Sequence, residues 1–271
     1  MKRICTIFFL TIIISVFSVG HLLAQQTIWP VGTARTVPKY EAEFGIIYPF
    51  RYGITDRTEI STSPLLLLSL SPNISIKHRW IEGNILVASK HSFNNPTLLL
   101  EAFSETGIFN LMPDSINAPF IYSFWNEGIV SYRFAPEQMI SARAGFRFAL
   151  KTGQSNLPVV QRPFFYQRAS IYHNKFLWYI GVGVDGNLYE DINYSADIDF
   201  LSVGAGVDFW AIEHKGMLIW NKSVKFAALA GYYISIANYP KGTDFGILPM
   251  LDFIWKINKK KKRLSKGLWR K

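Results

Sequence analysis

A histidine beside a serine is the pair of residue types in this chain that could support ester hydrolysis. His91 and Ser92 are adjacent and are followed by Asn94 and Asn95, and a serine nucleophile needs a histidine base with an orienting carboxylate or amide. In an extended strand, neighbouring side chains point to opposite faces, so His91 cannot readily activate Ser92, whereas an i, i+2 pair could. We interpret the stretch as a polar strand end entering a loop and expect no catalytic residues.

Metal ligands are the other candidates for chemistry. His78, His173 and His214 lie far apart, without the HxH or HExxH spacing that ligand pairs use. Asp197 and Asp199 share one face of a strand and could bind a cation near a rim, but they lack the glycine-bearing loop of a calcium site. We expect interfacial or turn histidines, solvated aspartates, and neither metal nor cofactor.

The strand pattern is clearest at residues 139–150. The even positions from Ile140 to Leu150 are all apolar, whereas Arg143 and Arg147 share the opposite face with a serine and a glycine. Successive side chains of a strand alternate between its faces, so this pattern indicates a wall with lipid on one side and water on the other.

The same alternation recurs along most of the chain, and after the N-terminus no apolar run is long enough for a membrane-spanning helix. Nearly half of the residues are hydrophobic and 15% are aromatic, which suits short strands with aromatic girdles. We predict an all-β fold, a transmembrane antiparallel β-barrel of about twelve strands at ~10 residues each, with ten as the alternative. A soluble β-sandwich is disfavoured because the face opposite the apolar one is often narrow and glycine-rich.

Two irregular stretches interrupt the strands. Residues 92–124 lose the pattern and contain prolines, which predicts an extracellular loop or one folded into the lumen. Residues 187–196 contain Glu190 and Asp191 and are interpreted as a polar extracellular loop.

Charged residues on the polar faces are predicted to line the lumen. They could form a selective ring in a water-filled pore or neutralise one another in a closed interior, and their mixed signs favour pairing. The predicted lumen-lining residues are Glu41, Glu43, Lys77, Arg79, Arg133, Arg143, Arg147 and Asp208.

The N-terminus reads as an export signal. Two basic residues precede an apolar run from Ile4 to Val19, and a cut is expected after Ala24. The single cysteine, Cys5, lies in this signal, so no disulfide or cysteine metal site is expected in the mature chain. The predicted organisation is a signal peptide at 1–24, a periplasmic lead-in at 25–38, an outer-membrane barrel at 39–258 and a basic periplasmic tail at 259–271.

The net charge of +10 comes from the two ends of the chain, because the body between them carries equal numbers of acidic and basic residues. A nucleic-acid partner is therefore not expected, since it would need a basic face on a folded surface. The tail is predicted to contact anionic lipid headgroups, with docking to a periplasmic partner as the alternative. Its contact residues are Lys259, Lys260, Lys261, Lys262 and Arg263.

Residues 49–60 read Pro-Phe-Arg-Tyr-Gly-Ile-Thr-Asp-Arg-Thr-Glu-Ile. They resemble the Pro-x-x-Tyr-Gly-x-Thr-Asp-Arg-x-Glu strand-turn-strand signature of outer-membrane barrels grouped with the phenol-degradation meta-pathway transporters. The Leu-Ala-Gln end of the signal also looks like those of exported Bacteroidetes proteins. The resemblance covers about residues 36–62 and implies passage of small, often hydrophobic compounds across the outer membrane, with no catalytic residues to carry over.

Three functions are compatible with these observations. The leading hypothesis is passive transport of a small, apolar or aromatic molecule through a barrel in the outer membrane of a Gram-negative bacterium. The second is a structural or partner-binding barrel with a closed lumen. The third is an outer-membrane lipid hydrolase, which would need His91 or another histidine beside a serine on one face.

Overall fold

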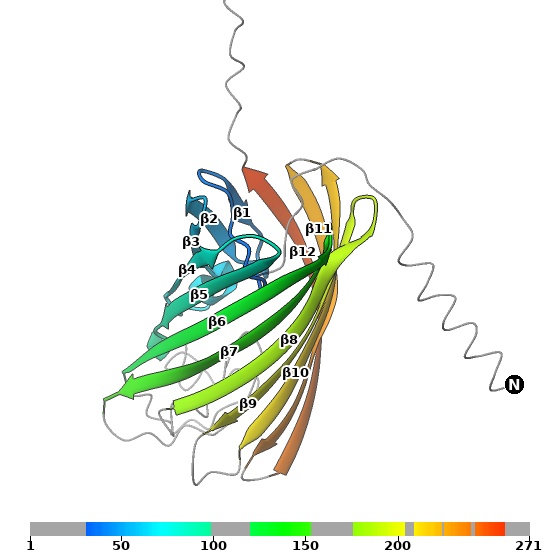
Figure 1. Cartoon of the computed structure of the whole chain (residues 1–271). Coiled ribbons are helices and arrows are strands. Elements are labelled where there is room, and N and C mark those ends of the chain that lie inside the picture. Colours follow the sequence, from blue (N-terminus) through cyan, green and yellow to red (C-terminus); the bar gives the residue numbers. More distant parts are fainter. Residues whose placement is uncertain are drawn as a thin grey trace, which may run out of the picture.

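The chain folds into one closed antiparallel barrel of twelve strands (Figure 1). The computed structural model describes residues 31–98, 120–152, 176–203, 209–223, 225–239 and 242–257. The elements are β1 (Ala42–Phe44), β2 (Phe50–Thr55), β3 (Thr58–Thr62), α2 (Pro64–Leu68), β4 (Asn73–Ile81), β5 (Ile85–Asn94), β6 (Ile121–Ala135), β7 (Gln138–Lys151), β8 (Phe176–Tyr189), β9 (Ile192–Val203), β10 (Trp210–Ser223), β11 (Phe226–Tyr239) and β12 (Gly242–Ile257). The prediction of about twelve strands is confirmed.

Closure comes from the pairing of the first and last strands. β1 pairs with β12 through Ala42 opposite Ile257 and Phe44 opposite Trp255, and every other strand pairs with its neighbours in sequence. A closed sheet has no edge strand with unpaired backbone groups. The barrel is therefore a single sheet, and the sandwich alternative is wrong.

The two ends of the barrel differ in their connections. Tight turns join β2 to β3, β4 to β5, β6 to β7, and β8 to β9, and they lie at the end where β1 begins and β12 finishes (Figure 1). We call this the turn end. The long connections after β5 and β7 lie at the opposite end, the loop end. Short turns at one end and long loops at the other are typical of outer-membrane barrels, with the short turns in the periplasm.

The prediction of a polar loop over residues 187–196 is wrong. Tyr189 ends β8 and Ile192 begins β9, so that only a tight turn separates them. Glu190 in that turn has a positive φ of 37°. The polar residues that suggested a loop thus occupy a turn and two strand ends at the turn end.

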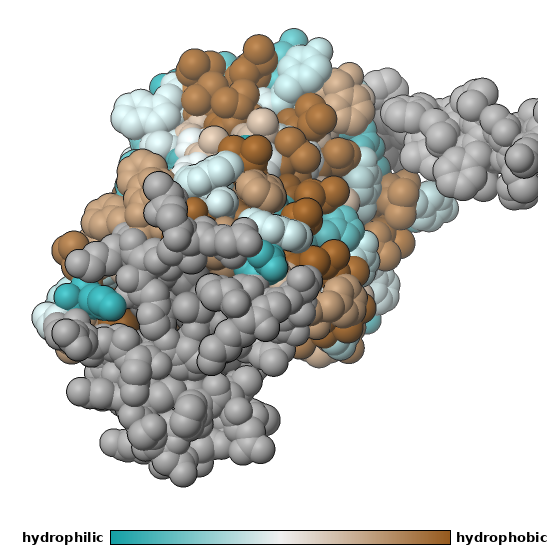
Figure 2. Space-filling model, turned by 90° about the horizontal axis from the view of Figure 1, so that it is seen from below, coloured by the Kyte–Doolittle hydropathy of each residue, from teal (hydrophilic) through white to brown (hydrophobic). Residues whose placement is uncertain are grey.

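The outer face is apolar and the inner face is mixed. Along β7, Ile140 and Leu150 are about half exposed, whereas Arg143 and Arg147 on the alternate positions are buried. The described residues seen from the loop end include many hydrophobic side chains (Figure 2). Exposed apolar side chains that alternate with buried polar ones match a lipid-facing outer wall.

The wall is lower at β1 to β3, which have only 3, 6 and 5 residues, compared with the ~9 to 11 that usually span a membrane. After β3 the leucine run forms α2, because Ser63 caps the helix and Pro64 occupies its first turn. Leu67 and Leu68 of this helix are exposed. No helix in the described ranges is long and apolar enough to cross a bilayer.

Candidate functional site

The first described residues enter the lumen. We name residues 31–38 the lumen segment. Val31 packs against a buried apolar cluster on the inner faces of β10 to β12, whereas Ala34 packs with Leu86, Ile129 and Met139 of β5 to β7. The segment therefore crosses the barrel from one inner wall to the other.

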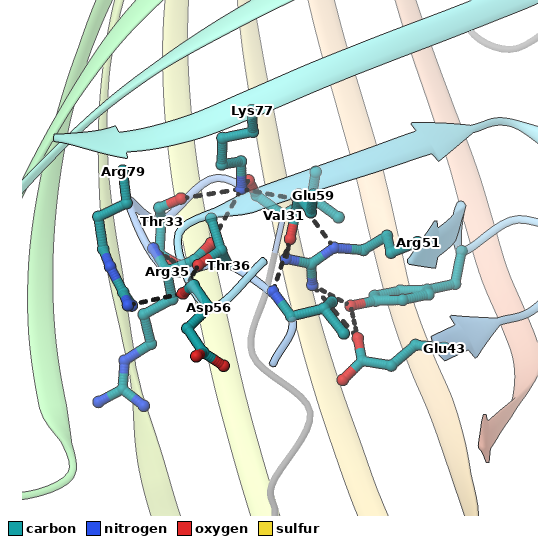
Figure 3. Close-up of polar contacts among 12 residues, drawn as sticks. Val31, Thr33, Arg35, Thr36, Glu43, Arg51, Asp56, Glu59, Lys77 and Arg79 are labelled. Atoms are coloured by element: carbon teal, nitrogen blue, oxygen red, sulfur yellow. Dashed lines mark hydrogen bonds and ion pairs between the residues drawn. The ribbon is translucent and has the colours of Figure 1, made fainter. Parts of the chain in front are cut away.

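Lys77 of β4 fastens this segment by its main chain (Figure 3). Its Nζ donates hydrogen bonds to the carbonyl oxygens of Val31, Thr33 and Arg35 at 3.0, 3.1 and 3.2 Å. The Lys77 side chain is only 1% exposed. An ammonium group has three donors, and these three carbonyls can use all of them. Lys77 thus holds the five residues from Val31 to Arg35 in one conformation.

Glu59 of β3 ties the segment to the wall from the other side. Its Oε2 accepts a hydrogen bond from the Val37 backbone N–H at 2.8 Å. The same carboxylate pairs with Arg51 at 2.7 Å and with Lys77 at 3.4 Å. Because Glu59 and Arg51 are nearly fully buried, their charges are compensated by each other and by the segment rather than by water.

The charged network continues to the seam of the barrel. Arg51 also pairs with Glu43 of β1 at 3.3 Å and donates to the Tyr48 hydroxyl oxygen at 2.8 Å. Burial raises the pKa of the Tyr48 hydroxyl well above its usual value, so the hydroxyl stays protonated and donates to Glu43 at 3.0 Å. Strands β1 to β4 are thus joined inside the lumen by one set of ion pairs and hydrogen bonds (Figure 3).

A second ion-pair cluster lies across the lumen on β7 and β9. The Arg143 guanidinium pairs with Asp197 at 2.8 Å and with Asp199 at 2.9 Å. Both aspartates lie opposite glycines of β8 in the strand register, and a Cβ on Gly181 would collide with the Asp199 carboxylate. A Cβ on Gly32 of the lumen segment would likewise collide with the Arg143 guanidinium. Room for the aspartates, and for the segment, depends on these missing side chains.

The β1–β2 loop also folds against the lumen wall. The carboxylate of Asp252 on β12 accepts hydrogen bonds from the backbone N–H groups of Ile46, Ile47 and Tyr48, at 3.0, 2.8 and 2.6 Å. Ile47 and Tyr48 join the same apolar cluster as Val31. The loop and the lumen segment together cover the inner faces of β10 to β12.

The inner wall changes character along the barrel. Toward the turn end the inner faces of β1 to β9 carry the charges described above. Toward the loop end, the inner residues of β6 to β10 and of the connection before β10 are apolar and buried. They are Ile121, Ala149, Leu177, Leu201, Val203, Phe209 and Ala211.

The structure places most of the predicted lumen residues. Glu43, Lys77 and Arg143 meet partners of opposite charge, and Arg147 donates to Ser123 at 2.7 Å with its guanidinium over the Trp125 ring. The remainder lie near the turn end or outside the site. Arg79 donates a hydrogen bond to the Asp56 carbonyl oxygen, and Arg133 lies near Arg35. Glu41 precedes β1, and its backbone carbonyl accepts a hydrogen bond from the Gly53 N–H. Asp208 and the tail residues 259–263 lie outside the described residues.

Arg51 and Glu59 were not predicted to line the lumen, although both lie in the strand-turn-strand signature. Their positions are odd, as are those of Lys77 and Arg79 on the next strand, but the turn at Asp56 broke the alternation that would have assigned them inward. The lumen segment gave no signal, since its backbone carbonyls rather than its side chains make most of the contacts.

The structure shows where the candidate catalytic and metal-binding residues lie. His91 faces outward and Ser92 inward, which agrees with the expectation that adjacent strand residues cannot act together. Asp197 and Asp199 hold Arg143 rather than water, so the expectation of solvated aspartates is wrong. His78 and His214 lie on the outer face, and His173 is outside the described residues.

No protein-family model matches this sequence, and no curated protein matches it. Among solved structures, a KdgM porin in complex with disordered oligogalacturonate is 8% identical over 81% of this chain and 97% of that chain, with a TM-score of 0.41. The NanC porin is 7% identical over 80% and 96%, with a TM-score of 0.44. The CymD monoaromatic hydrocarbon channel is 6% identical over 81% and 87%, with a TM-score of 0.34. These values are too low to carry over a ligand or a function.

Proposed function

We propose that this chain is an outer-membrane barrel that lets a small apolar or aromatic molecule cross passively, and that the lumen segment closes the route in the conformation described. One observation carries the proposal. The turn-end half of the lumen is crossed by a stretch of main chain fastened by hydrogen bonds from Lys77 and Glu59. A fastening of this kind can be released without breaking the wall.

A membrane location is supported by the outer face. Exposed large apolar residues occur on ten of the twelve strands, the exceptions being β3 and β1, where Phe44 stacks on Trp255 of β12. Aromatic side chains lie toward both ends, with Trp80 and Tyr132 near the turn end and Phe146 and Phe176 near the loop end. Such girdles mark the two interfaces of a transmembrane barrel. By the usual orientation, the turn end faces the periplasm of a Gram-negative cell.

The apolar inner wall toward the loop end supports the solute class. Leu177, Leu201 and Phe209 are buried apolar side chains of the inner wall, and a route that opened along this wall would favour a molecule that loses few hydrogen bonds on entry over a sugar or an ion. The resemblance of residues 49–60 to the phenol-degradation group suggests the same class. We infer membership of that group, and a Bacteroidetes-type source, from this signature and the signal ending alone.

A barrel with a permanently closed lumen is the second candidate. It is favoured by the near-complete burial of the inward charges, since Arg51, Glu59, Lys77 and Arg143 are each no more than 5% exposed. A water-filled pore would hydrate such groups. In this case the extracellular loops and the predicted tail at 259–271 would carry the function by binding a partner.

Ion currents across planar bilayers separate the two candidates. The refolded chain from Gln25 onward is compared with a variant that lacks residues 25–38. Transport predicts brief, rare openings for the intact chain and a sustained current for the shortened one. Absence of current from both proteins would remove the transport proposal.

The solute class is tested on the open variant by current block. Benzyl alcohol should reduce the ion current at lower concentration than xylitol, which has a similar length but many hydroxyl groups. Equal block by the two compounds would contradict an apolar route while leaving the pore itself intact.

A further inference from the structure

The outer face of the described strands carries a polar patch on β3 to β6 that the transport function does not use. It follows a diagonal across β3 to β6, with Thr58 opposite His78, His78 opposite Ser89, and His91 opposite Asn126 in the strand register. We name these five residues the outer patch. Around it the outer positions are apolar, including Ile76, Phe93, Phe124 and Phe146. Polar side chains facing hydrocarbon are costly and are a signal of function.

His91 is oriented by an amide. Its Nδ1 lies 2.8 Å from Asn126 Oδ1, and an amide oxygen can only accept, so Nδ1 carries the proton and Nε2 is left as the basic nitrogen. His91 is exposed, and no described residue bonds its Nε2. His214 of β10, which also faces outward, differs because its two ring nitrogens bond the Asp197 carbonyl oxygen and the Tyr232 hydroxyl.

Ser89 stands two residues before His91 and faces the same side. Two residues along a strand span about 6.6 Å, a separation that the length of a histidine side chain can bridge to a serine hydroxyl. In this structure the Ser89 Oγ accepts a hydrogen bond from Trp80 Nε1 at 2.9 Å. For Ser89 and His91 to act together, Oγ must turn about χ1 from Trp80 toward His91 Nε2, which would leave the Trp80 N–H to donate to another oxygen.

We propose that Ser89, His91 and Asn126 form a hydrolytic site for ester-linked lipid on the outer wall of the barrel. Ser89 Oγ attacks the ester carbonyl carbon while His91 Nε2 takes the hydroxyl proton, and Trp80 Nε1–H donates to the oxyanion. His91 then protonates the departing alcohol oxygen as the ester bond breaks, which leaves an acyl group on Ser89. A water molecule, deprotonated by His91, releases the fatty acid and restores the serine.

The position of the patch suits this substrate class. Phe93 and Phe124 flank His91 and Asn126 on the loop-end side. The Phe93 ring contacts Tyr122 in a tilted arrangement, and the Phe124 ring stacks on Phe148. With the exposed Trp80 on the turn-end side of Ser89, these rings surround the patch with an apolar surface that acyl chains can contact. The inference rests on the proposed membrane location but not on an open lumen.

The test uses the refolded full-length mature chain in mixed micelles with a phospholipid that carries a fluorogenic acyl ester. Hydrolysis should fall by about 100-fold or more in S89A and H91A, and less in N126A, because loss of the nucleophile or base removes the acyl step. The matched control is S92A, which faces inward on the same strand and should retain activity. Bilayer currents of all variants should equal that of the unmodified chain, so failure of the transport proposal stays separate.

Covalent labelling makes the test independent of any folding defect in the variants. A fluorophosphonate probe should modify Ser89 of the unmodified chain, as read by peptide mass spectrometry. It should no longer do so in H91A, while S92A is labelled normally. Hydrolysis absent from the unmodified chain, or unchanged in S89A, would overturn the proposal.

Discussion

At the scale of single residues, Lys77 is the side chain that holds the lumen segment in place across the barrel. The sequence indicated that Lys77 faces inward, because it alternates with Ile74 and Ile76 on β4, but it gave no partner for the ammonium. The partners are three carbonyl oxygens from a stretch more than 40 residues earlier. Backbone carbonyl acceptors do not depend on the type of side chain, so the contacts of Lys77 with the lumen segment could not be predicted from the residue pattern.

Replacing Lys77 by methionine should open the lumen. Lys77→Met keeps the length of the side chain but removes all three donors, and each hydrogen bond to a charged group contributes about 1.5 to 3 kcal/mol. We expect the open fraction in planar bilayers to rise at least 10-fold. Lys90→Met is the matched control, since Lys90 is the inward lysine opposite Lys77 in the strand register. Equal currents from the two variants would show that Lys77 does not hold the segment.

Arg35 is predicted to act in the opposite sense. Burial, followed by the like charges of Arg133 and Arg79, lowers the pKa of Arg35 to about 10. Its proton is therefore held less strongly in the closed barrel than in water, which means that the charge opposes docking of the segment at any pH below about 10. In the Arg35→Gln variant the lumen segment should bind the inner wall more tightly, and the open fraction at pH 7 should be lower than that of the unmodified chain. A higher open fraction would mean that this charge stabilises the closed state.

At the scale of elements, inward glycines of β8 set the position of the Arg143 cluster. The sequence predicted inner faces that are often narrow and glycine-rich, and on β8 Asp199 occupies the space above Gly181. The identity of that occupant required the β8–β9 register, which the misassigned loop at 187–196 concealed. Strand faces were thus predictable, whereas the pairs formed across strands were not.

Gly181→Ala should lower the stability of the barrel. The added Cβ would push Asp199 from its position and leave Arg143 with one carboxylate, at a cost of about 1 to 3 kcal/mol. The shift to unfolded migration on unheated gels should occur at a lower urea concentration than in the unmodified chain. The control is Gly246→Ala on β12, where a Cβ would meet nothing within 4 Å. Equal midpoints for the two variants would contradict this packing argument.

The β1–β2 loop depends on a single carboxylate. Asp252→Ala removes the acceptor of three backbone N–H groups, and buried donors without partners are expensive. We expect hydrogen exchange at Ile46, Ile47 and Tyr48 to accelerate by at least 10-fold. Unchanged exchange at these amides would mean that other contacts hold the loop.

At the scale of the whole molecule, the fold class and the strand number followed from period-two alternation, because every strand must present one face to lipid. The closed lumen did not follow. It depends on residues 31–38, which have no alternation, and on the β1–β2 loop, which folds against the inner wall through Asp252. The barrel wall is encoded locally, whereas the material inside it is held by contacts between residues far apart in sequence.

A reversible disulfide across the lumen tests the closure most directly. Ala34 N donates to Ser131 Oγ at 2.9 Å, so Ala34→Cys with Ser131→Cys places two thiols close together in a chain whose only cysteine is Cys5 of the predicted signal. Ion current is recorded from the oxidised protein and again after reduction, with Ala34→Cys alone as the control. We predict no current from the oxidised double variant and channel openings after reduction. A current of equal size before and after reduction would contradict closure by the lumen segment.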